Sequence, residues 1–410
     1  MLPLIPNSDF SPSSPWIGIY TGSGASHSWL WFVEILDRMG FSHIHFVDEG
    51  DILSNALQSL SVLLMSGGDT FAIAEGLGAE GSDKLQSFIN RGGLYIGTCA
   101  GAYLPLKSSK GFLNQFNFID VKIANISRKL SEPERHSLPK GACSSYGCDF
   151  IFHAVREDVV LEMTNGNPEN EKREMIAPLY GGPSLLPSED IEPIATYKGF
   201  TEKTRFLVEK ELAEKTLIGN IAVAKKSMGK GHLYIFGPHF EHPHFHPCNL
   251  FLTEVIRKKG NGRFRPIQKD FYGAPNPGET LRNFLRDLKR ELSHSRIAAS
   301  GMREATINWQ IGNKYYDPEK IQIFLEALWR RLTYLESRGE VAGDFQDLDE
   351  LISKLREITD ILRKMKKGMD RGEATNELAE DLFPNLKKVT SDFLTIYFRT
   401  KRMDSTRPQI

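Results

Sequence analysis

Between position 16 and about position 260, short apolar runs alternate with stretches in which apolar residues recur every three or four positions. The apolar runs are continuous rather than alternating, which is typical of strands buried on both faces. Runs and helical stretches in regular succession predict an α/β domain with a doubly wound, mostly parallel sheet and helices on both of its faces. The first strands are expected in WIGIYTG (16–22), HIHFVD (43–48), VLLMSGG (62–68) and LYIGTCA (94–100).

Beyond Pro105 the apolar runs become less regular, and they predict an antiparallel extension at one edge of the sheet. The last strand of this half, GHLYIF (231–236), leads the chain to His239. The other candidate strands are FNFIDVKIANI (116–126), FIFHAV (150–155), VVLEM (159–163), IEPIATY (191–197), TRFLVE (204–209) and IAVAKK (221–226).

The rest of the chain has a different period. After a segment rich in glycine, proline and asparagine, apolar residues such as Ile321, Phe324 and Leu328 recur at helical spacing. About four long amphipathic stretches predict an all-α helical bundle, with the apolar stripes as its core. The predicted organisation is an N-terminal tail (1–15), the α/β domain (16–260), a linker (261–279), the helical bundle (280–402) and a C-terminal tail (403–410).

The composition narrows the class of function. The formal net charge of -1 over 410 residues gives no long-range field that would attract nucleic acid or anionic lipid. No apolar run approaches the roughly 18 residues of a membrane span, and the N-terminus does not resemble a secretory signal. Four cysteines in a chain of this length favour a reducing compartment. We therefore expect a cytoplasmic protein that binds neither nucleic acid nor membrane.

The most informative stretch is GTCAG (97–101), which follows an apolar strand directly. Its spacing is that of a nucleophile elbow, with cysteine in place of serine. It predicts that Cys99 presents an exposed thiol at a helix N-terminus, where the helix dipole lowers the thiol pKa. The Ala100 amide is a candidate donor to an oxyanion, and the Gly67 and Gly68 loop is a candidate for the second donor. A buried cysteine that only packs is the alternative.

A thiolate nucleophile needs a base, and the base needs a group that orients it. Residues i and i+2 of an extended segment face the same way, so His239 and Glu241 of GPHFE (237–241) are expected to project together from a strand end. The carboxylate would hold the imidazole, and the imidazole would take the proton of the thiol. Cys99, His239 and Glu241 are the predicted catalytic triad.

Three motifs in this order, SGGDTF (66–71), GTCAGAYL (97–104) and GPHFE (237–241), resemble class I glutamine amidotransferases. Within that superfamily the chain is most similar to the biotin-protein ligase N-terminal domain family. The motifs that carry this second likeness are IGIYTGSGAS (17–26), APLYGGPSLLP (177–187) and GKGHLYIFGPHFEHP (229–243).

This resemblance covers about residues 16–260, and it implies a flavodoxin-like, glutamine amidotransferase-like fold with the cysteine triad. It also makes Tyr180, Gly181 and Gly182 candidates for substrate binding, although a tight turn beside the pocket explains them equally well. Biotin ligase activity is not predicted, because helices stand where the ligases carry their catalytic domain. No ammonia-accepting domain is recognisable, so an amidotransferase would need a partner protein.

Two other groups of residues contain histidine or cysteine side chains, which are common metal ligands. His242, His244 and His246 have a spacing that suits zinc, but prolines fix the backbone between them and no acidic pair completes the site. We expect hydrogen-bonded loop histidines. Cys143 and Cys148 could form a redox pair or half of a zinc site, but a second C-x-x-C is missing, so separate thiols are expected. We predict no metal and no cofactor.

Together these patterns predict a cysteine hydrolase or amidase that cleaves a carboxamide or peptide-type C–N bond through an acyl-thioester. Its partners would be a small-molecule amide or peptide substrate and a protein that docks on the helical bundle. Two alternatives stay open. One is a non-catalytic ligand-binding or scaffold module, and the other is a cysteine peptidase similar to the intracellular proteases that share this elbow.

Overall fold

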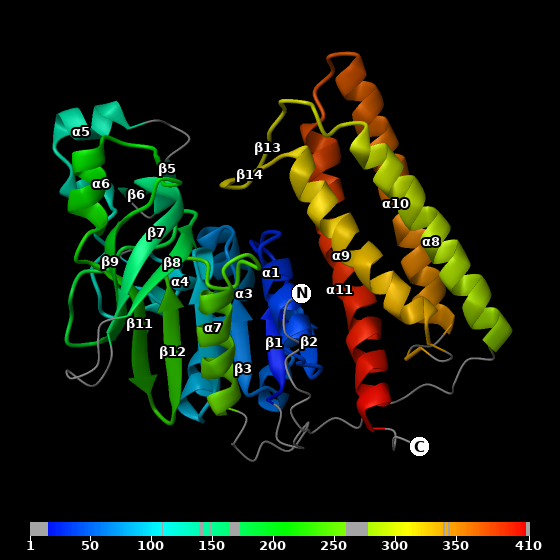
Figure 1. Cartoon of the computed structure of the whole chain (residues 1–410), viewed down its shortest axis with the longest axis horizontal. Coiled ribbons are helices and arrows are strands. Elements are labelled where there is room, and N and C mark those ends of the chain that lie inside the picture. The colour runs from blue at the N-terminus through cyan, green and yellow to red at the C-terminus, as the bar shows by residue number, and fades with distance from the viewer. Residues whose placement is uncertain are drawn as a thin grey trace.

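The structure is a computed structural model of the whole chain, in which an α/β part is followed by a helical part (Figure 1). It describes residues 15–108, 110–138, 143–146, 149–164, 173–259, 278–338, 341–342 and 345–406. Residues 261–277 of the predicted linker and Cys148 lie outside these residues, and the last two linker positions, 278 and 279, belong to the first long helix. No helix within the described ranges is both long and apolar enough to cross a membrane.

One half of the main sheet is parallel, as the apolar runs predict. Its strands lie in the order β2-β1-β3-β4-β12, and each neighbouring pair is parallel. Their carboxyl ends therefore meet at one edge, where α/β proteins place their sites. The strands are β1 (Ile17–Tyr20), β2 (Ile44–Val47), β3 (Val62–Met65), β4 (Leu94–Thr98) and β12 (Gly231–Phe236).

The other half of the sheet is antiparallel, which confirms the predicted extension. It continues from β12 through β11, β9 and β7, and both β8 and β10 pair with β7. The segment 116–126 is not the predicted strand, because it makes only isolated bridges, such as Ile123 with Leu185. The strands here are β7 (Val155–Met163), β8 (Glu174–Leu179), β9 (Glu192–Phe200), β10 (Arg205–Phe206) and β11 (Ile221–Met228), and β5 (Cys143–Tyr146) and β6 (Asp149–Phe152) form a separate pair.

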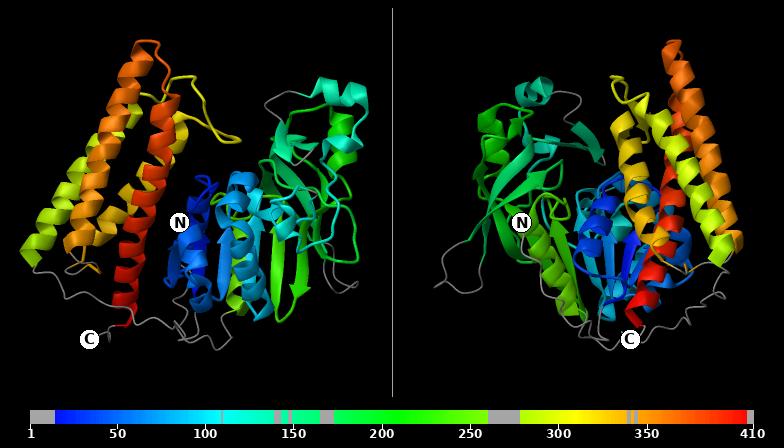
Figure 2. Two further views of the ribbon diagram at one scale, coloured as in Figure 1. Left: turned by 180° about the vertical axis from the view of Figure 1, so that it is seen from behind. Right: turned by 45° about the vertical axis from the view of Figure 1, so that its right-hand side comes forward.

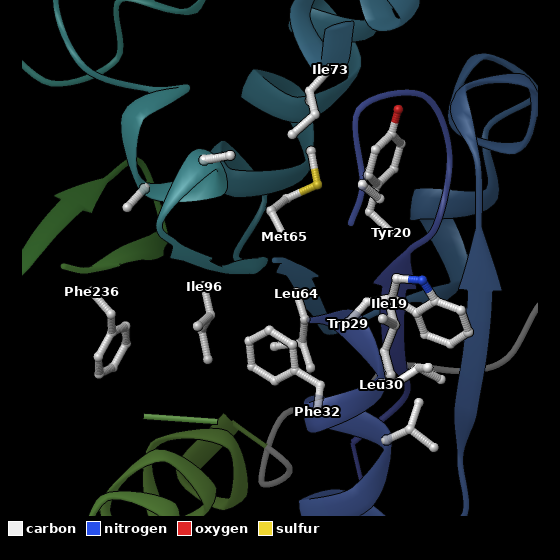
Figure 3. Packing of buried hydrophobic residues seen from close by; sticks show 14 of the residues in the cluster. Ile19, Tyr20, Trp29, Leu30, Phe32, Leu64, Met65, Ile73, Ile96 and Phe236 are labelled. Atoms are coloured by element: carbon white, nitrogen blue, oxygen red, sulfur yellow. The ribbon is translucent and has the colours of Figure 1, made fainter. Parts of the chain in front are cut away.

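Helices cover both faces of the parallel strands. Trp29, Leu30 and Phe32 of α1 lie on one side of these strands, and Ile73 of α3 lies on the other (Figure 3). All four side chains are buried, and each contributes roughly 1.5–3 kcal/mol of transfer free energy. The helices of this part are α1 (Trp29–Arg38), α2 (Glu49–Leu53), α3 (Thr70–Asn90), α4 (Ala100–Tyr103), α5 (Glu132–Ser137), α6 (Lys210–Leu217) and α7 (His246–Lys259).

The C-terminal part contains the four long helices that the apolar stripes predict. The stripe residues Ile321, Phe324 and Leu328 are all buried. One feature escaped prediction: the two short strands β13 (Trp309–Ile311) and β14 (Lys314–Tyr316) form a hairpin between the first two long helices. The helices are α8 (Gly278–Ser300), α9 (Pro318–Glu336), α10 (Phe345–Asp370) and α11 (Asn376–Thr406).

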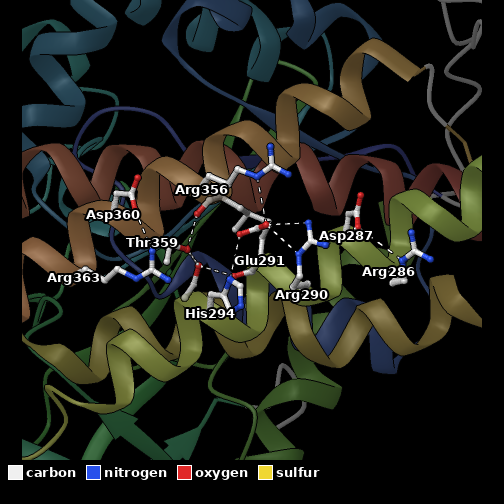
Figure 4. Close-up of polar contacts among 11 residues, drawn as sticks. Arg286, Asp287, Arg290, Glu291, His294, Arg356, Thr359, Asp360 and Arg363 are labelled. Atoms are coloured by element: carbon white, nitrogen blue, oxygen red, sulfur yellow. Dashed lines mark hydrogen bonds and ion pairs between the residues drawn. The ribbon is translucent and has the colours of Figure 1, made fainter.

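Polar side chains also meet between α8 and α10 (Figure 4). Glu291 of α8 accepts from Arg356 of α10 at 3.4 Å and from Arg290 of its own helix. Burial raises the pKa of Glu291, but these arginines outweigh it and the net shift is downward. The buried hydroxyls of Ser295 and Thr359 lie 2.7 Å apart one turn further on. Directional contacts of this kind fix the register of two helices whose apolar stripes alone would permit sliding.

The helical part packs beside the parallel end of the sheet, with α11 against the edge strand β2 (Figures 1 and 2). Phe398 of α11 lies 6.2 Å from Phe46 of β2, measured between ring centroids, and Phe324 of α9 lies 6.1 Å from Trp29 of α1. A helix against an edge strand also protects it from pairing with another chain.

Charged side chains complete this interface around Asp37 of α1. Arg331 of α9 is buried, and its Nε donates to Asp37 Oδ2 at 3.0 Å while Nη2 donates to Glu34 at 3.3 Å. From α11, the Tyr397 hydroxyl donates to Asp37 Oδ1 at 3.0 Å, and Lys401 also pairs with Asp37. A single carboxylate thus joins the α/β part to two helices of the bundle.

We expect Arg331→Ala to lower the free energy of unfolding by about 2 kcal/mol, because it removes a buried guanidinium and its ion pairs with Asp37 and Glu34, while Lys401 still pairs with Asp37. Urea denaturation followed by tryptophan fluorescence measures this change. Arg330→Ala is the matched control, since Arg330 is 63% exposed and lies 3.8 Å from the same Glu34; its effect should stay below about 0.5 kcal/mol. Equal losses in the two variants would contradict a special role for the buried arginine.

Candidate functional site

A sharp turn joins β4 to α4 at Cys99. The backbone of Cys99 has φ 49° and ψ -109°, a strained conformation for a residue with a side chain. The small neighbours are required, because a Cβ on Gly101 would lie 2.2 Å from the Met65 carbonyl oxygen and one on Gly97 would lie 2.2 Å from the Gly101 oxygen. The chain therefore forms the elbow that the GTCAG spacing indicates.

The thiol is less accessible than the sequence suggests. Cys99 is only 8% exposed, so the expectation of an exposed thiol is wrong. The helix after the elbow, Ala100–Tyr103, is a single turn, so its dipole is small. Cys99 instead borders a narrow cavity of about 60 Å³. Its walls come from the turns after β3, β4 and β8, from Ile151 and His153, and from the β13–β14 hairpin.

His239 and Glu241 meet in the turn that follows β12. His239 Nδ1 lies 2.6 Å from Glu241 Oε1, and both side chains are buried. The segment is not extended as predicted, because the amide of Phe240 bonds to the Pro238 carbonyl and that of His242 to the His239 carbonyl. The two side chains converge because the chain turns and not because a strand alternates.

Thr98 adds a third member to this contact. Its hydroxyl donates to Glu241 Oε1 at 2.9 Å, and both residues are completely buried. The same carboxylate oxygen thus accepts from Thr98 and from the His239 imidazole. Because Nδ1 is engaged by the carboxylate, Nε2 is the ring nitrogen left for Cys99.

Cys99 and His239 both lie beside Gly67, on the side to which a Cβ of this residue would point. A Cβ built on Gly67 would lie 3.1 Å from His239 Cε1 and 3.3 Å from Cys99 Cβ. Burial alone would raise the pKa of the thiol, but a hydrogen bond and the charge of His239 outweigh it, and the Cys99 pKa is lowered. Burial alone would lower the pKa of His239, but the charge of Glu241 and the contacts with Glu241 and Cys99 outweigh burial, and the His239 pKa is raised. Both shifts favour a thiolate–imidazolium pair.

The other predicted residues divide into two groups. Gly68, Ala100, Tyr180 and Gly181 line the cavity with Cys99, and the Cys99 sulfur lies 3.7 Å from the Tyr180 carbonyl oxygen. Gly67 and Gly182 lie behind the cavity wall. A Cβ on Gly182 would lie 1.9 Å from the Gly237 oxygen. Gly182 therefore packs closely against the backbone that leads to His239.

Several residues at the site were not found from the sequence. Trp31 of α1 packs edge-on against the His239 ring with centroids 5.3 Å apart. Tyr103 borders the cavity and donates to the Gly181 carbonyl at 3.2 Å. Asn313 and Lys314 reach the cavity from the distant hairpin. Only Thr98, which is adjacent to Cys99 in sequence, carried a local signal, since a polar residue at the end of a buried strand needs a partner.

The remaining histidines and cysteines that the structure describes have other surroundings. Within the described residues, no group of three or more histidine, cysteine or acidic side chains could hold a metal ion. The His242 and His244 rings lie 5.3 Å apart, and burial followed by the charge of His239 lowers the pKa of His242 to about 4. Cys143 is half-buried, and Cys248 is buried with its sulfur 3.3 Å from the Ile176 carbonyl oxygen.

Comparison with known proteins gives one family match. Residues 17–123 match the family described as biotin-protein ligase, N terminal. The matched segment includes Gly67, Gly68 and Cys99, and it ends before His239. No curated protein sequence matches this chain significantly.

Solved structures share the fold only loosely. A β-galactosidase from Rahnella sp. R3 matches with 13% identity and a TM-score of 0.34, covering 59% of this chain and 32% of its own. A β-galactosidase from Halorubrum lacusprofundi matches with 13% identity and a TM-score of 0.35, and the match covers 62% of this chain and 32% of the galactosidase. A cytoplasmic protein from Salmonella typhimurium LT2 matches with 10% identity and a TM-score of 0.34, and the match covers 59% of this chain and 98% of the Salmonella protein. The chain thus spans about a third of those galactosidases, and likenesses at this level carry no functional argument.

We expect the rate at which iodoacetamide alkylates Cys99 to rise with pH through an apparent pKa below the ~8.5 of free cysteine, because His239 stabilises the thiolate. His239→Asn keeps the burial and removes the cation. The apparent pKa should then move above ~8.5, and the rate at pH 7 should fall at least about tenfold. Mass spectrometry of the Cys99 peptide measures both.

Cys248 serves as the internal control in the same digest, because burial, followed by the charge of Glu241, raises its pKa to about 12. It should react slowly in both proteins. A wild-type apparent pKa for Cys99 at or above that of free cysteine would show that the imidazole does not activate the thiol.

Proposed function

We propose that this protein is a cysteine hydrolase that cleaves the C–N bond of a small carboxamide, with Cys99, His239 and Glu241 as its catalytic residues. The observation that carries the proposal is the pair of hydrogen bonds from Thr98 to Glu241 and from His239 to Glu241, with Cys99 and the His239 ring both lying beside Gly67. The Cys99 thiol lies on a strained turn beside a cavity. Strain and shifted pKa values together are typical of a working site.

The chemistry follows from the charge state of the pair. The Cys99 thiolate attacks the carbonyl carbon and forms a tetrahedral oxyanion. As the C–N bond breaks, His239 Nε2 gives its proton to the leaving amine, and an acyl-thioester remains on Cys99. A water molecule then gives a proton to His239 and attacks the thioester, which releases the acid and restores the thiolate. Glu241 keeps the imidazole oriented through both steps.

A fixed peptide unit supports an oxyanion donor beside the thiol. The Gly67 carbonyl oxygen accepts from the Ser26 amide at 3.0 Å and from the hydroxyls of Ser26 and Ser28 at 2.9 and 3.3 Å. In a trans peptide the next N–H points the opposite way, so the Gly68 amide faces away from these serines. Gly68 borders the Cys99 cavity. Its amide and that of Ala100 are the proposed pair of donors.

The size of the cavity favours a small amide. About 60 Å³ beside the sulfur is room for a few atoms, which suits the entry of a terminal carboxamide group. A purely ligand-binding module would not require a thiol with a lowered pKa near a buried imidazole.

The topology and the family match support a place in the glutamine amidotransferase-like superfamily. The strand order β2-β1-β3-β4-β12 is that of flavodoxin-like sheets, and the match to the biotin-protein ligase N-terminal family covers the elbow. We propose this relationship without biotin ligase activity. A partner protein on the helical bundle and a cytoplasmic location remain parts of the same proposal.

Ammonia release from a panel of small carboxamides, together with covalent labelling by an electrophilic glutamine analogue, tests the proposal. Cys99→Ala should abolish both signals. Glu241→Gln should keep the shape of the site but lower turnover by roughly a hundredfold or more, because the imidazole loses the charge that holds it. Labelling that persists in Cys99→Ala would exclude this nucleophile.

Cys143→Ala is the matched control, since it removes a half-buried thiol outside the cavity. It should leave labelling and turnover at the wild-type level. A Glu241→Gln protein with wild-type turnover would remove the carboxylate from the mechanism.

A further inference from the structure

The β13–β14 hairpin leaves the helical bundle and extends over the carboxyl ends of the parallel strands (Figures 1 and 2). Its residues Asn313 and Lys314 line the same cavity as Cys99. The α/β part therefore does not enclose its own site, because one wall comes from a segment more than two hundred positions further along the chain.

Contacts at both ends hold the hairpin in place. At its base, Trp309 Nε1 donates to the Thr375 hydroxyl at 2.8 Å, and the Tyr316 ring lies 4.2 Å from that of Phe383. At its tip, the Asn313 amide donates to Asp69 Oδ2 at 2.9 Å. Asp69 also caps the N-terminus of α3, directly after the Gly67–Gly68 loop. The tip is thus fixed to the loop that borders the thiol.

Lys314 supplies the positive charge of this cavity. Residues 314 and 316 lie on the same side of β14, and Tyr316 is buried while Tyr315 between them is exposed, so Lys314 lies on the inward side. Among the described cavity-lining residues it carries the one fixed positive charge. Burial, followed by Lys314, lowers the pKa of His153 to about 4, so that imidazole is neutral at pH 7.

Asp69 is the acidic residue among the described residues of this cavity wall, and its carboxylate accepts hydrogen bonds from the chain. Asp69 Oδ1 accepts from the Phe71 amide at 2.9 Å, and Oδ2 accepts from Asn313. No ion pair between Lys314 and a carboxylate occurs within the described parts of the chain. Lys314 is therefore a cation near the nucleophile without an ion-pair partner among the described residues, and such a cation can meet a negative charge on the substrate.

We propose that Lys314 is a substrate-binding residue that recognises a carboxylate on the amide substrate, so that the helical part of the chain determines the specificity of the α/β site. The inference rests on the proposed function and adds the substrate class: an amide that also bears an acidic group within reach of the scissile carbonyl.

A larger cavity, of about 480 Å³, lies between the loop after β1 and α11, and Lys314 lines it as well. It contains both signs of charge, with Asp48, Glu49 and Asp51 facing Lys387 and Lys388. Its charges therefore give no clear preference for an anion. Cys99 does not line this larger cavity, so the proposed contact of Lys314 with a substrate belongs to the small cavity, which both residues line.

Two alkylating reagents that differ by one charge test the proposal on the full chain. Iodoacetate carries a carboxylate, iodoacetamide is neutral, and both react with the same thiolate. The ratio of their rates at Cys99, measured at one pH, therefore cancels any change in the thiolate fraction. We expect Lys314→Gln to lower the iodoacetate-to-iodoacetamide ratio by about tenfold, the loss of one charged contact. Lys314→Arg should keep most of the wild-type ratio.

Lys320→Gln is the matched control. It removes an equal charge from the nearby helix α9, where Lys320 pairs with Asp317 and lies outside the small cavity, and the ratio should stay at the wild-type value. A ratio that is unchanged in Lys314→Gln, while Cys99 still reacts with both reagents, overturns the role of Lys314 and leaves the nucleophile intact. Failure of both reagents at Cys99 in the wild type overturns the proposed function and this inference together.

Discussion

The site depends on the register of the parallel pairing between β4 and β12. Thr98 lies opposite Phe236 in this register, and the Cys99 amide continues the pairing to the Phe236 carbonyl at 3.3 Å. Both strands therefore end at the same height, and the elbow and the His239 turn leave the sheet side by side. A shift of one residue in this register would turn Thr98 away from Glu241 and break the contact that joins the two loops.

The strain at Cys99 is offset by contacts on every side of the elbow. A residue in such a backbone conformation costs roughly 1–3 kcal/mol. The Gly101 amide bonds to the Ser66 carbonyl at 3.1 Å, the Tyr95 hydroxyl to the Gly101 carbonyl at 2.6 Å and the Thr70 hydroxyl to the Ala100 carbonyl at 3.1 Å. These bonds come from β3, β4 and α3, so the rigid sheet and its covering helix hold the thiol where a flexible loop could not.

The features predicted correctly from the sequence are those that depend on residues close together in the chain. Continuous apolar runs located the buried strands, helical stripes located the four bundle helices, and the glycine spacing located the elbow. The burial of Cys99 and the turn at His239 were not predicted, because they depend on packing between distant segments. The β13–β14 hairpin was missed for the same reason: its three-residue strands carry almost no periodic signal, and its position is set by Asp69, far away in the chain.

The two parts of the chain are joined by directional contacts, and this has a consequence for the site. Apolar packing between α11 and β2 would tolerate small sliding movements, since hydrophobic contact is non-directional. The hydrogen bonds of Arg331 to Asp37 and of Asn313 to Asp69 resist such sliding, because a hydrogen bond weakens steeply when its geometry changes. One bond fixes the bundle against α1, and the other fixes the hairpin against the loop beside the thiol. The position of Lys314 relative to Cys99 is thus specified from both ends, which the role that we propose for this residue requires.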